Sequence, residues 1–204
     1  MAEQLEYTEG TTFNDVVRHK AATIGDKVFM TYIRDFDQGI DEKYTYRDMH
    51  ILSNRLANCL LRLGLRRKDG ISLFEINSPE FIISLFSVFK LGAYVVLVNT
   101  GLKGDSLQYI IDHSDSKALI VHWSLLDRYL ALKDQLPKIK HVIVETNEAP
   151  EDFILPEGMF SFQQLLKSEE KDIESKIEAE DMSVLIYTSG TPVCPSLLVK
   201  FHGF

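Results

Sequence analysis

The sequence predicts an α/β fold: a mostly parallel sheet with helices on both faces. Short apolar runs, each long enough for one buried strand, alternate with segments whose apolar residues repeat at helical spacing. Strands that are apolar throughout are typical of a parallel sheet covered on both sides. No internal repeat or low-complexity linker interrupts the alternation, so we expect one α/β unit.

The first predicted elements are a helix and a hairpin. Residues 12–22 show an amphipathic helical pattern, and 27–33 are rich in apolar and β-branched residues. The polar stretch 35–39 contains glycine and precedes a second short strand around Tyr44. Two strands joined by such a loop indicate a hairpin.

The next helix has clear start and stop signals. Thr45, with Asp48 three residues later, resembles a capping box. Gly64 supplies the stop, because glycine readily adopts the left-handed conformation that ends many helices. Between them, five apolar residues repeat at helical spacing: Met49, Leu52, Leu56, Leu60 and Leu63.

Residues 81–98 allow two interpretations. The segment has 18 residues and one charge, Lys90, so a membrane-spanning helix must be considered. A lysine near the bilayer centre costs roughly 2.5–3.5 kcal/mol, however, and Gly92 divides the segment. We therefore predict a buried helix at 81–91 followed by a buried strand at 93–98, with Ser78 as the N-cap of the helix and Pro79 at the first helical position.

The remaining elements follow the same alternation. The polar stretch 145–158 is expected to be a loop, and the charged segment 168–181 is expected to include exposed helix. Further strands are predicted at 71–76, 118–121, 141–144 and 183–187, and further helices at 105–114, 125–133 and 162–167.

Composition excludes several classes of protein. A net charge of −8 without a long basic cluster argues against a nucleic-acid-binding protein. Two cysteines, Cys59 and Cys194, form no disulfide framework, which fits a reducing cytoplasm. The N-terminus lacks the pattern of a secretory signal, and the six histidines show no metal-ligand spacing. We expect a cytoplasmic protein without a transmembrane segment and without a metal site of its own side chains.

The last predicted strand opens into a turn with the chemistry of a phosphate site. Thr188, Ser189, Gly190 and Thr191 follow Tyr187 directly. Their N–H and hydroxyl groups are the donors that phosphate oxygens need, and the glycine permits close approach of the backbone. In open α/β sheets such a turn lies at the carboxyl edge, where ligands bind. The spacing is not that of a Walker A motif, and an ordinary turn is the simpler interpretation of these residues taken alone.

The turn at 187–191 and several segments before it resemble one family of enzymes. The stretch Tyr-Thr-Ser-Gly-Thr at 187–191 is similar to the start of the phosphate-binding loop of the AMP-forming acyl-CoA synthetases, the adenylate-forming superfamily. The resemblance covers most of residues 11–191 and identifies the chain as an incomplete part of the large N-terminal domain. Segments with the family's order and spacing lie at 44–48, 52–57, 77–81, 90–93 and 99–100.

The resemblance implies a reaction and its cofactors. Such enzymes use ATP and Mg²⁺ to convert a carboxylic acid into an acyl-adenylate, and then transfer the acyl group to CoA. It implies that Thr188, Ser189, Gly190 and Thr191 hold the ATP phosphates. The stretch 99–105 is most similar to ligases for fatty or carnitine-like acids. We therefore expect the parent enzyme to use a small-molecule acid as its substrate, with a fatty acid as the first candidate.

The chain departs from the family pattern after Thr191. The family continues Thr-Gly-Leu-Pro-Lys, whereas Pro192 begins a different sequence that ends at Phe204. Deleting one base from the second threonine codon of the family pattern yields Thr-Pro-Val-Cys-Pro, as at 191–195. We therefore predict a partial AMP-binding domain at 1–191 and a frameshifted tail at 192–204, with an authentic divergent tail as the alternative. Catalytic residues of the family lie beyond this stretch, so none is assigned and the chain is expected to be inactive.

Two other functions deserve comparison. Residues 104–107 match the Gly-Asp-Ser-Leu signature of serine esterases, but no aspartate has a histidine three residues later, as those enzymes usually require. Asp105 and Ser106 also begin a predicted helix, where they are ordinary capping residues. Alternatively, the chain is a non-catalytic binding or oligomerisation module that self-associates through an exposed sheet edge.

Overall fold

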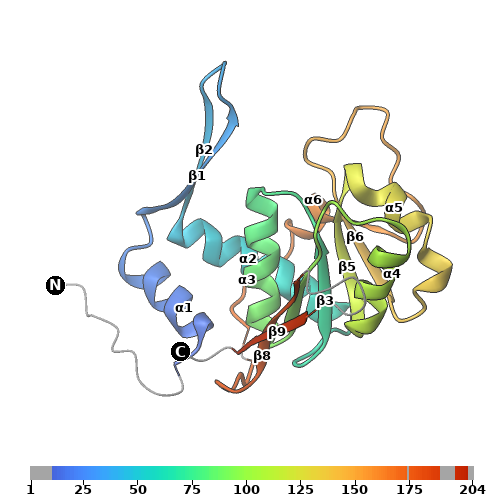
Figure 1. Cartoon of the computed structure of the whole chain (residues 1–204). Coiled ribbons are helices and arrows are strands. Elements are labelled where there is room, and N and C mark those ends of the chain that lie inside the picture. Colours follow the sequence, from blue (N-terminus) through green and yellow to red (C-terminus); the bar gives the residue numbers. More distant parts are fainter. Residues whose placement is uncertain (1–10, 174, 189–195, 202–204) are drawn as a thin grey trace.

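The computed structural model describes residues 11–173, 175–188 and 196–201, and a sheet of seven strands forms its centre (Figure 1). The strands are β3 (Gly70–Phe74), β4 (Tyr94–Leu97), β5 (Ser116–His122), β6 (His141–Glu145), β7 (Phe160–Ser161), β8 (Met182–Thr188) and β9 (Ser196–Phe201). They lie in the order β7-β6-β5-β3-β4-β8-β9. Six of them run parallel, and only β9 is antiparallel to its neighbour β8.

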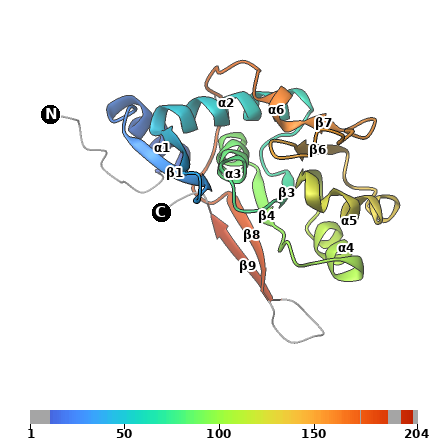
Figure 2. The same ribbon diagram turned by 90° about the horizontal axis from the view of Figure 1, so that it is seen from above.

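Helices cover both faces of this sheet, as Figure 2 shows. On one side lie α1 (Phe13–Thr23), α2 (Tyr46–Arg62), α3 (Pro79–Leu91) and α6 (Phe162–Leu165), and on the other lie α4 (Gly104–His113) and α5 (Leu126–Leu130). The fully buried β3 alternates between the two cores: Ile71 and Leu73 face the first set of helices, and Phe74 faces the second. The predicted fold class is confirmed.

The predicted helix caps are present. At the start of α2, the Asp48 N–H donates to Thr45 Oγ1 at 3.1 Å and the Thr45 N–H donates to Asp48 Oδ2 at 2.8 Å. At the start of α3, the Phe81 N–H donates to Ser78 Oγ at 3.1 Å. Each cap satisfies donors that the first helical turn leaves unpaired. Gly64, just past α2, has a φ of +92°, which supports its predicted role as the stop.

The predicted hairpin consists of β1 (Val28–Asp35) and β2 (Ile40–Thr45), which pair antiparallel. It projects from the body of the molecule (Figure 1). Phe36, in the turn, is 83% exposed. Arg34 forms ion pairs with Glu42 across the hairpin and with Glu148 in the loop after β6, so the hairpin contacts the main body by charge as well as by packing.

The segment 81–98 is a buried helix and a buried strand, as predicted. Lys90, the one charge, is almost fully buried and donates to Asn54 Oδ1 at 2.7 Å. Its ammonium also lies 3.0 Å from His50 Nδ1. Burial lowers the pKa of Lys90 to about 8. Within the described residues, no helix has the length and apolar character needed to cross a membrane.

The prediction of an exposed helix within 168–181 was wrong. The described residues of this segment run without helix across α2. Side chains of α2 satisfy its carbonyl groups: Asn54 Nδ2 donates to the Glu170 carbonyl at 3.1 Å, and Asn58 Nδ2 donates to the Lys171 carbonyl at 2.7 Å. Because these partners replace the hydrogen bonds that a helix would form internally, the extended course is stable.

Two further details differ from expectation. The helix predicted at 125–133 is divided into a 3₁₀ turn at Trp123–Leu125, the short α5, and a second turn at Lys133–Gln135. Strand β7 was not predicted, because two residues carry no measurable period. The 3₁₀ turns allow the chain to bend around the core without leaving its backbone groups unpaired.

Candidate functional site

The stretch predicted to bind phosphate begins at Thr188, the last residue of β8. This strand pairs in parallel with β4, with Val184 opposite Val95 and Ile186 opposite Leu97. Its carboxyl end therefore lies at the same edge of the sheet as the carboxyl ends of β3, β4, β5 and β6. This is the edge at which ligands bind in open parallel sheets.

The strand is one residue longer at this end than expected. Thr188 is the last residue of β8 and pairs through its backbone with Ser196 of β9, which runs back along β8. Thr188 therefore belongs to the strand rather than to the turn. The other three predicted site residues, Ser189, Gly190 and Thr191, lie outside the described residues.

The residue before Thr188 is fixed by contacts with α4. The Tyr187 hydroxyl lies 2.8 Å from His113 Nδ1, and the His113 ring stacks on Tyr109 with centroids 5.1 Å apart. Burial raises the pKa of Tyr187 to about 12, so its phenol is neutral at physiological pH. These contacts hold the end of β8 against α4, and thereby fix the point at which the predicted phosphate loop begins.

A second polar cluster lies at the same edge, on β5 and β6. His122 and Glu145 are opposite one another in the parallel register, and His122 Nε2 lies 3.2 Å from Glu145 Oε2. The other oxygen of Glu145 accepts the Asn147 N–H at 2.5 Å and Gln163 Nε2 at 3.0 Å. Both His122 and Glu145 are almost fully buried. A buried carboxylate with several donors is well solvated by the protein.

Two more buried carboxyl groups lie near this cluster. Burial raises the pKa of Glu75 to about 8, and the neighbouring Glu145 and Glu80 add to the effect. Burial also raises the pKa of Glu80, with Glu145 contributing. Ser84 of α3 opposes the rise at Glu75, but among the described residues neither Glu75 oxygen nor the Ser84 hydroxyl has a hydrogen-bond partner. At neutral pH, Glu75 is therefore mainly a neutral acid.

Sequence reasoning missed this second cluster, although a signal was present. His122 closes the apolar run of β5, and Glu145 closes the apolar run of β6. Polar residues at the carboxyl ends of adjacent parallel strands must lie side by side at one edge. The order of the strands was needed to show that these two are neighbours.

The Gly-Asp-Ser-Leu stretch begins α4, as expected. Ser106 is exposed in the first turn of this helix. The N-cap is Lys103, without a side-chain hydrogen bond, so Asp105 and Ser106 do not themselves cap the helix as predicted.

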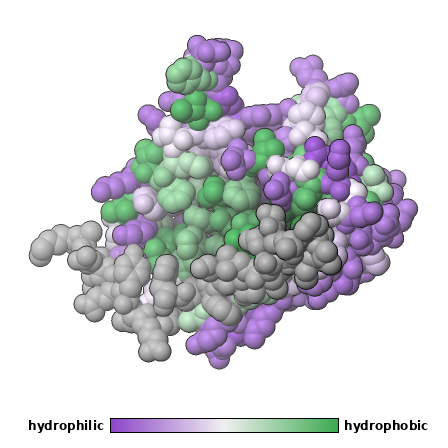
Figure 3. Space-filling model, in the orientation of Figure 1, coloured by the Kyte–Doolittle hydropathy of each residue, from purple (hydrophilic) through white to green (hydrophobic). Residues whose placement is uncertain are grey.

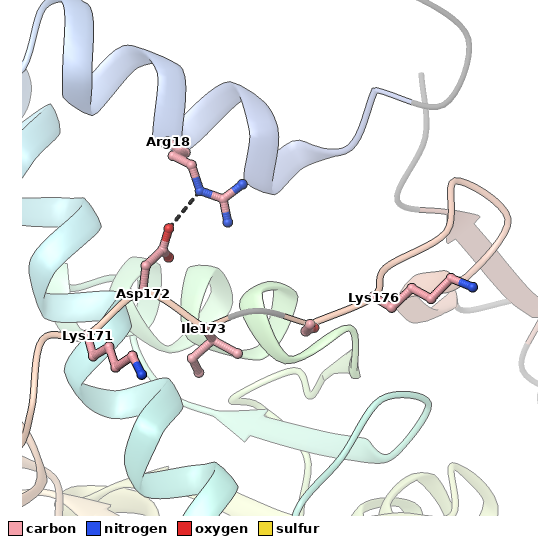
Figure 4. A pocket seen from close by; sticks show the side chains of 6 residues that line it. Arg18, Lys171, Asp172, Ile173 and Lys176 are labelled. Carbon is pink, nitrogen blue, oxygen red and sulfur yellow. Dashed lines mark hydrogen bonds and ion pairs between the residues drawn. The ribbon is translucent and has the colours of Figure 1, made fainter.

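A broad open pocket lies away from this edge, between α1 and the segment 168–181 (Figure 4). Its volume is about 650 Å³. Arg18 of α1 and Asp172 point toward one another across it and form an ion pair at 2.6 Å. Of the predicted phosphate-binding residues the structure describes Thr188, which does not line this pocket. Within the described part of the chain, no group of three or more metal-ligating side chains is arranged to hold a metal ion.

The strand order and the two helical layers define an α/β protein whose parallel strands end at one common edge. The family model described as AMP-binding enzyme matches residues 17–192. The chain belongs to this family, and the predicted membership in the AMP-forming acyl-CoA synthetase superfamily is confirmed.

Curated relatives are acid–CoA ligases. The chain is 33% identical to 4-hydroxybutyrate–CoA ligase 2 of Metallosphaera sedula over 79% of its length and 30% of the relative's. It is 27% identical to crotonobetaine/carnitine–CoA ligase of Escherichia fergusonii over 92% of its length and 34% of the relative's. The chain therefore spans about a third of the length of these curated relatives.

Solved structures share the fold. The anthranilate–CoA ligase AuaEII, in complex with anthranoyl-AMP, superposes with a TM-score of 0.80 at 26% identity, covering 96% of this chain and 35% of that one. A long-chain-fatty-acid–CoA ligase of Archaeoglobus fulgidus gives a TM-score of 0.81 at 20% identity, and the match covers 98% of this chain and 38% of that one. The latter likeness concerns the fold alone.

Proposed function

We propose that this chain is the phosphate-binding N-terminal part of an AMP-forming acid–CoA ligase. In the parent enzyme, a carboxylate oxygen of the acid attacks the α-phosphorus of ATP, and pyrophosphate leaves. The CoA thiol then attacks the acyl carbon and AMP leaves. The observation that carries the proposal is the sequence Thr188–Thr191, which starts at the carboxyl end of β8 beside the anchored Tyr187.

The residues of this stretch fit the phosphate groups of ATP. Ser189 and Thr191 supply hydroxyl and N–H donors, and Gly190 lets the backbone approach charged oxygens closely. Mg²⁺, when bound with ATP, neutralises phosphate charge. Pro192 has no N–H to donate where the family pattern has a second threonine. We infer a weakened phosphate site and no adenylation activity in this chain alone.

We propose an aliphatic carboxylic acid, with a fatty acid the best candidate, as the substrate of the parent. The two curated relatives named above are described as ligases for 4-hydroxybutyrate and for crotonobetaine or carnitine. These names support an aliphatic acid rather than an aromatic one, although the anthranilate ligase shares the fold.

Pyrophosphate release in the presence of a fatty acid, ATP, Mg²⁺ and CoA tests the inferred inactivity, and turnover above background would contradict it. Thermal melting with and without ATP·Mg²⁺ tests the phosphate site. We expect ATP to raise the melting temperature, and we expect the double variant Ser189→Ala, Thr191→Ala to lose that rise. Thr31→Ala, exposed on the hairpin, is the matched control and should keep it. An equal rise in all three proteins would refute the assignment of the site.

We also propose that residues 1–191 form the partial AMP-binding domain and that 192–204 are a frameshifted tail. The match to the family model ends at 192, which supports this boundary. Sequencing the gene tests it: an uninterrupted reading frame without a family-like continuation in another frame would exclude the frameshift.

A non-catalytic binding or oligomerisation module is the second candidate. Apolar surface gathers over α3 below the hairpin (Figure 3). It includes partly exposed side chains of α3, namely Phe81, Ile82 and Leu85. Apolar patches of this kind often mark interaction sites. Light scattering over a wide range of protein concentration tests this candidate, and a monomer at every concentration would exclude self-association.

A further inference from the structure

A serine, a histidine and a glutamate lie next to one another at the carboxyl ends of β5 and β6. Ser124 Oγ lies 2.7 Å from His122 Nδ1. On the other side of the ring, His122 Nε2 lies 3.2 Å from Glu145 Oε2. This is the order of nucleophile, base and orienting acid that activates hydroxyl nucleophiles on unrelated folds. The two ring nitrogens have exchanged roles relative to the serine proteases.

The hydrogen bonds fix which nitrogen of His122 carries the proton. The Ser124 N–H also donates to Nδ1, at 3.3 Å, so Nδ1 is the acceptor. The proton of the neutral ring therefore resides on Nε2, which lies 3.2 Å from Glu145 Oε2. Nδ1 is free to take the proton of the Ser124 hydroxyl.

Exposure differs along the three residues in the way that catalysis requires. Ser124 is exposed, so a substrate can reach its hydroxyl. His122 is 5% exposed and Glu145 is 3% exposed. Glu145 is held in place by the Asn147 N–H and by Gln163, so the acid that orients the ring is itself fixed. A fixed base and acid beneath an accessible hydroxyl is a preorganised arrangement.

Burial favours the neutral form of His122. Burial lowers the pKa of His122, while Glu145 and Glu148 oppose this effect. A small cavity beside the ring is also lined by Tyr32, Arg34 and Glu80. Arg34 is paired with Glu42 and Glu148, and burial raises the pKa of Glu80. A neutral imidazole at physiological pH is the state that a general base needs.

We propose that Ser124, His122 and Glu145 form an esterase site that accepts acyl groups from small activated esters and hydrolyses them. Ser124 Oγ attacks the ester carbonyl carbon, and the hydroxyl proton moves to His122 Nδ1. The carbon–oxygen bond to the leaving group then breaks, and His122 returns the proton to that oxygen. Water attacks the acyl-serine by the same route, releasing the acid and restoring Ser124. No nucleotide takes part, so the proposal is independent of the phosphate site.

Apolar side chains lie close to the nucleophile and favour an apolar acyl group. Trp123, adjacent in the chain, packs edge-on against Phe153 with ring centroids 6.3 Å apart. Ile154 is 85% exposed on the same loop as Phe153. Sites for small ligands are lined mainly by apolar and aromatic side chains, with a few polar groups among them.

A purely structural role for His122 makes a different prediction. His122 begins the turn Trp123–Leu125 by accepting the Ser124 N–H, and this capping role needs only Nδ1. The esterase also needs the charge of Glu145 to stabilise the imidazolium that forms during acyl transfer. Glu145→Gln retains an acceptor for the Nε2 proton but removes the charge, so it separates the two roles.

The test is hydrolysis of p-nitrophenyl acetate by the full chain. We expect Ser124→Ala and Glu145→Gln each to lower the rate on the order of 100-fold, the contribution typical of general base catalysis. Ser106→Ala, which alters the other exposed serine considered for an esterase, is the matched control and should keep the wild-type rate. Thermal melting verifies that each variant is folded.

Mass spectrometry after brief exposure to the ester gives a second readout that does not depend on the Glu145 variant. We expect an acetyl group on the peptide that contains Ser124, and none there in Ser124→Ala. Absence of this adduct from the wild-type chain, or wild-type hydrolysis by a folded Glu145→Gln variant, would refute the esterase and leave His122 as a helix cap.

Discussion

Glu75 provides a sharp test of the buried polar layer beneath α3. Its side chain follows β3, is 6% exposed, and has no hydrogen-bond partner for either carboxyl oxygen within the described structure. Its pKa is raised from 4.5 to about 8, because burial penalises the charged form and Glu145 and Glu80 add repulsion. The perturbation is Glu75→Gln, which preserves shape and removes the titrating proton.

The sign of the effect follows from the direction of the shift. Between pH 4.5 and about pH 8, the folded chain keeps the Glu75 proton and the unfolded chain loses it. The contribution of Glu75 to the stability of the wild type is therefore greatest below the lower value and falls as the pH rises through the upper one. The shift corresponds to a loss on the order of 5 kcal/mol across this window. The glutamine variant does not undergo this loss.

The assay is urea unfolding of both proteins at a series of pH values across the window. The free energy of unfolding of the wild type should fall relative to that of Glu75→Gln as the pH rises. Glu157→Gln, an exposed glutamate in the loop before β7, is the matched control and should follow the wild-type curve. Parallel curves for the wild type and Glu75→Gln would refute the reasoning, because they would show that Glu75 titrates alike in both states.

Three further changes test local features. Thr45→Ala removes the cap of α2 and should cost about 1 kcal/mol in urea unfolding; an unchanged midpoint would contradict the role of the cap. Gly70→Ala places a Cβ 2.6 Å from the Tyr94 hydroxyl and 2.7 Å from its ring, so we expect a loss of about 1–3 kcal/mol and a lower melting temperature. Asp181→Asn removes the carboxylate that Arg67 contacts at 2.5 and 2.9 Å. Arg67 lowers the pKa of Asp181 to about 2, so the variant should be less stable than the wild type at neutral pH. This difference in the free energy of unfolding should shrink as the pH falls from about 4 towards 2, because the wild-type carboxylate is then protonated. A difference that stays constant would exclude the ion pair.

Much of the fold was predictable because its signals are local. The caps at Thr45 and Ser78 and the stop at Gly64 each depend on a few neighbouring residues. The apolar runs of the parallel strands are equally local, since burial on both faces leaves no room for polar positions. These signals placed most helices and strands close to their observed bounds.

The segment 168–181 was mispredicted for the opposite reason. Its charged sequence is compatible with an exposed helix, but its carbonyl groups are satisfied by Asn54 and Asn58, more than a hundred residues earlier in the chain. Asp172 likewise pairs with Arg18 of α1. Contacts over such sequence distances override local propensity, and no local pattern reports them.

The candidate sites divide in the same way. The hydroxyl and glycine residues after Tyr187 are adjacent in the chain, so the sequence alone indicates the family and predicts a phosphate-binding turn. The tertiary structure decided that His122 and Glu145 face one another, because only the strand order makes β5 and β6 neighbours. The tertiary structure also buries Glu75, because α3 packs over the end of β3. Composition determines which groups can ionise, and packing determines what surrounds them.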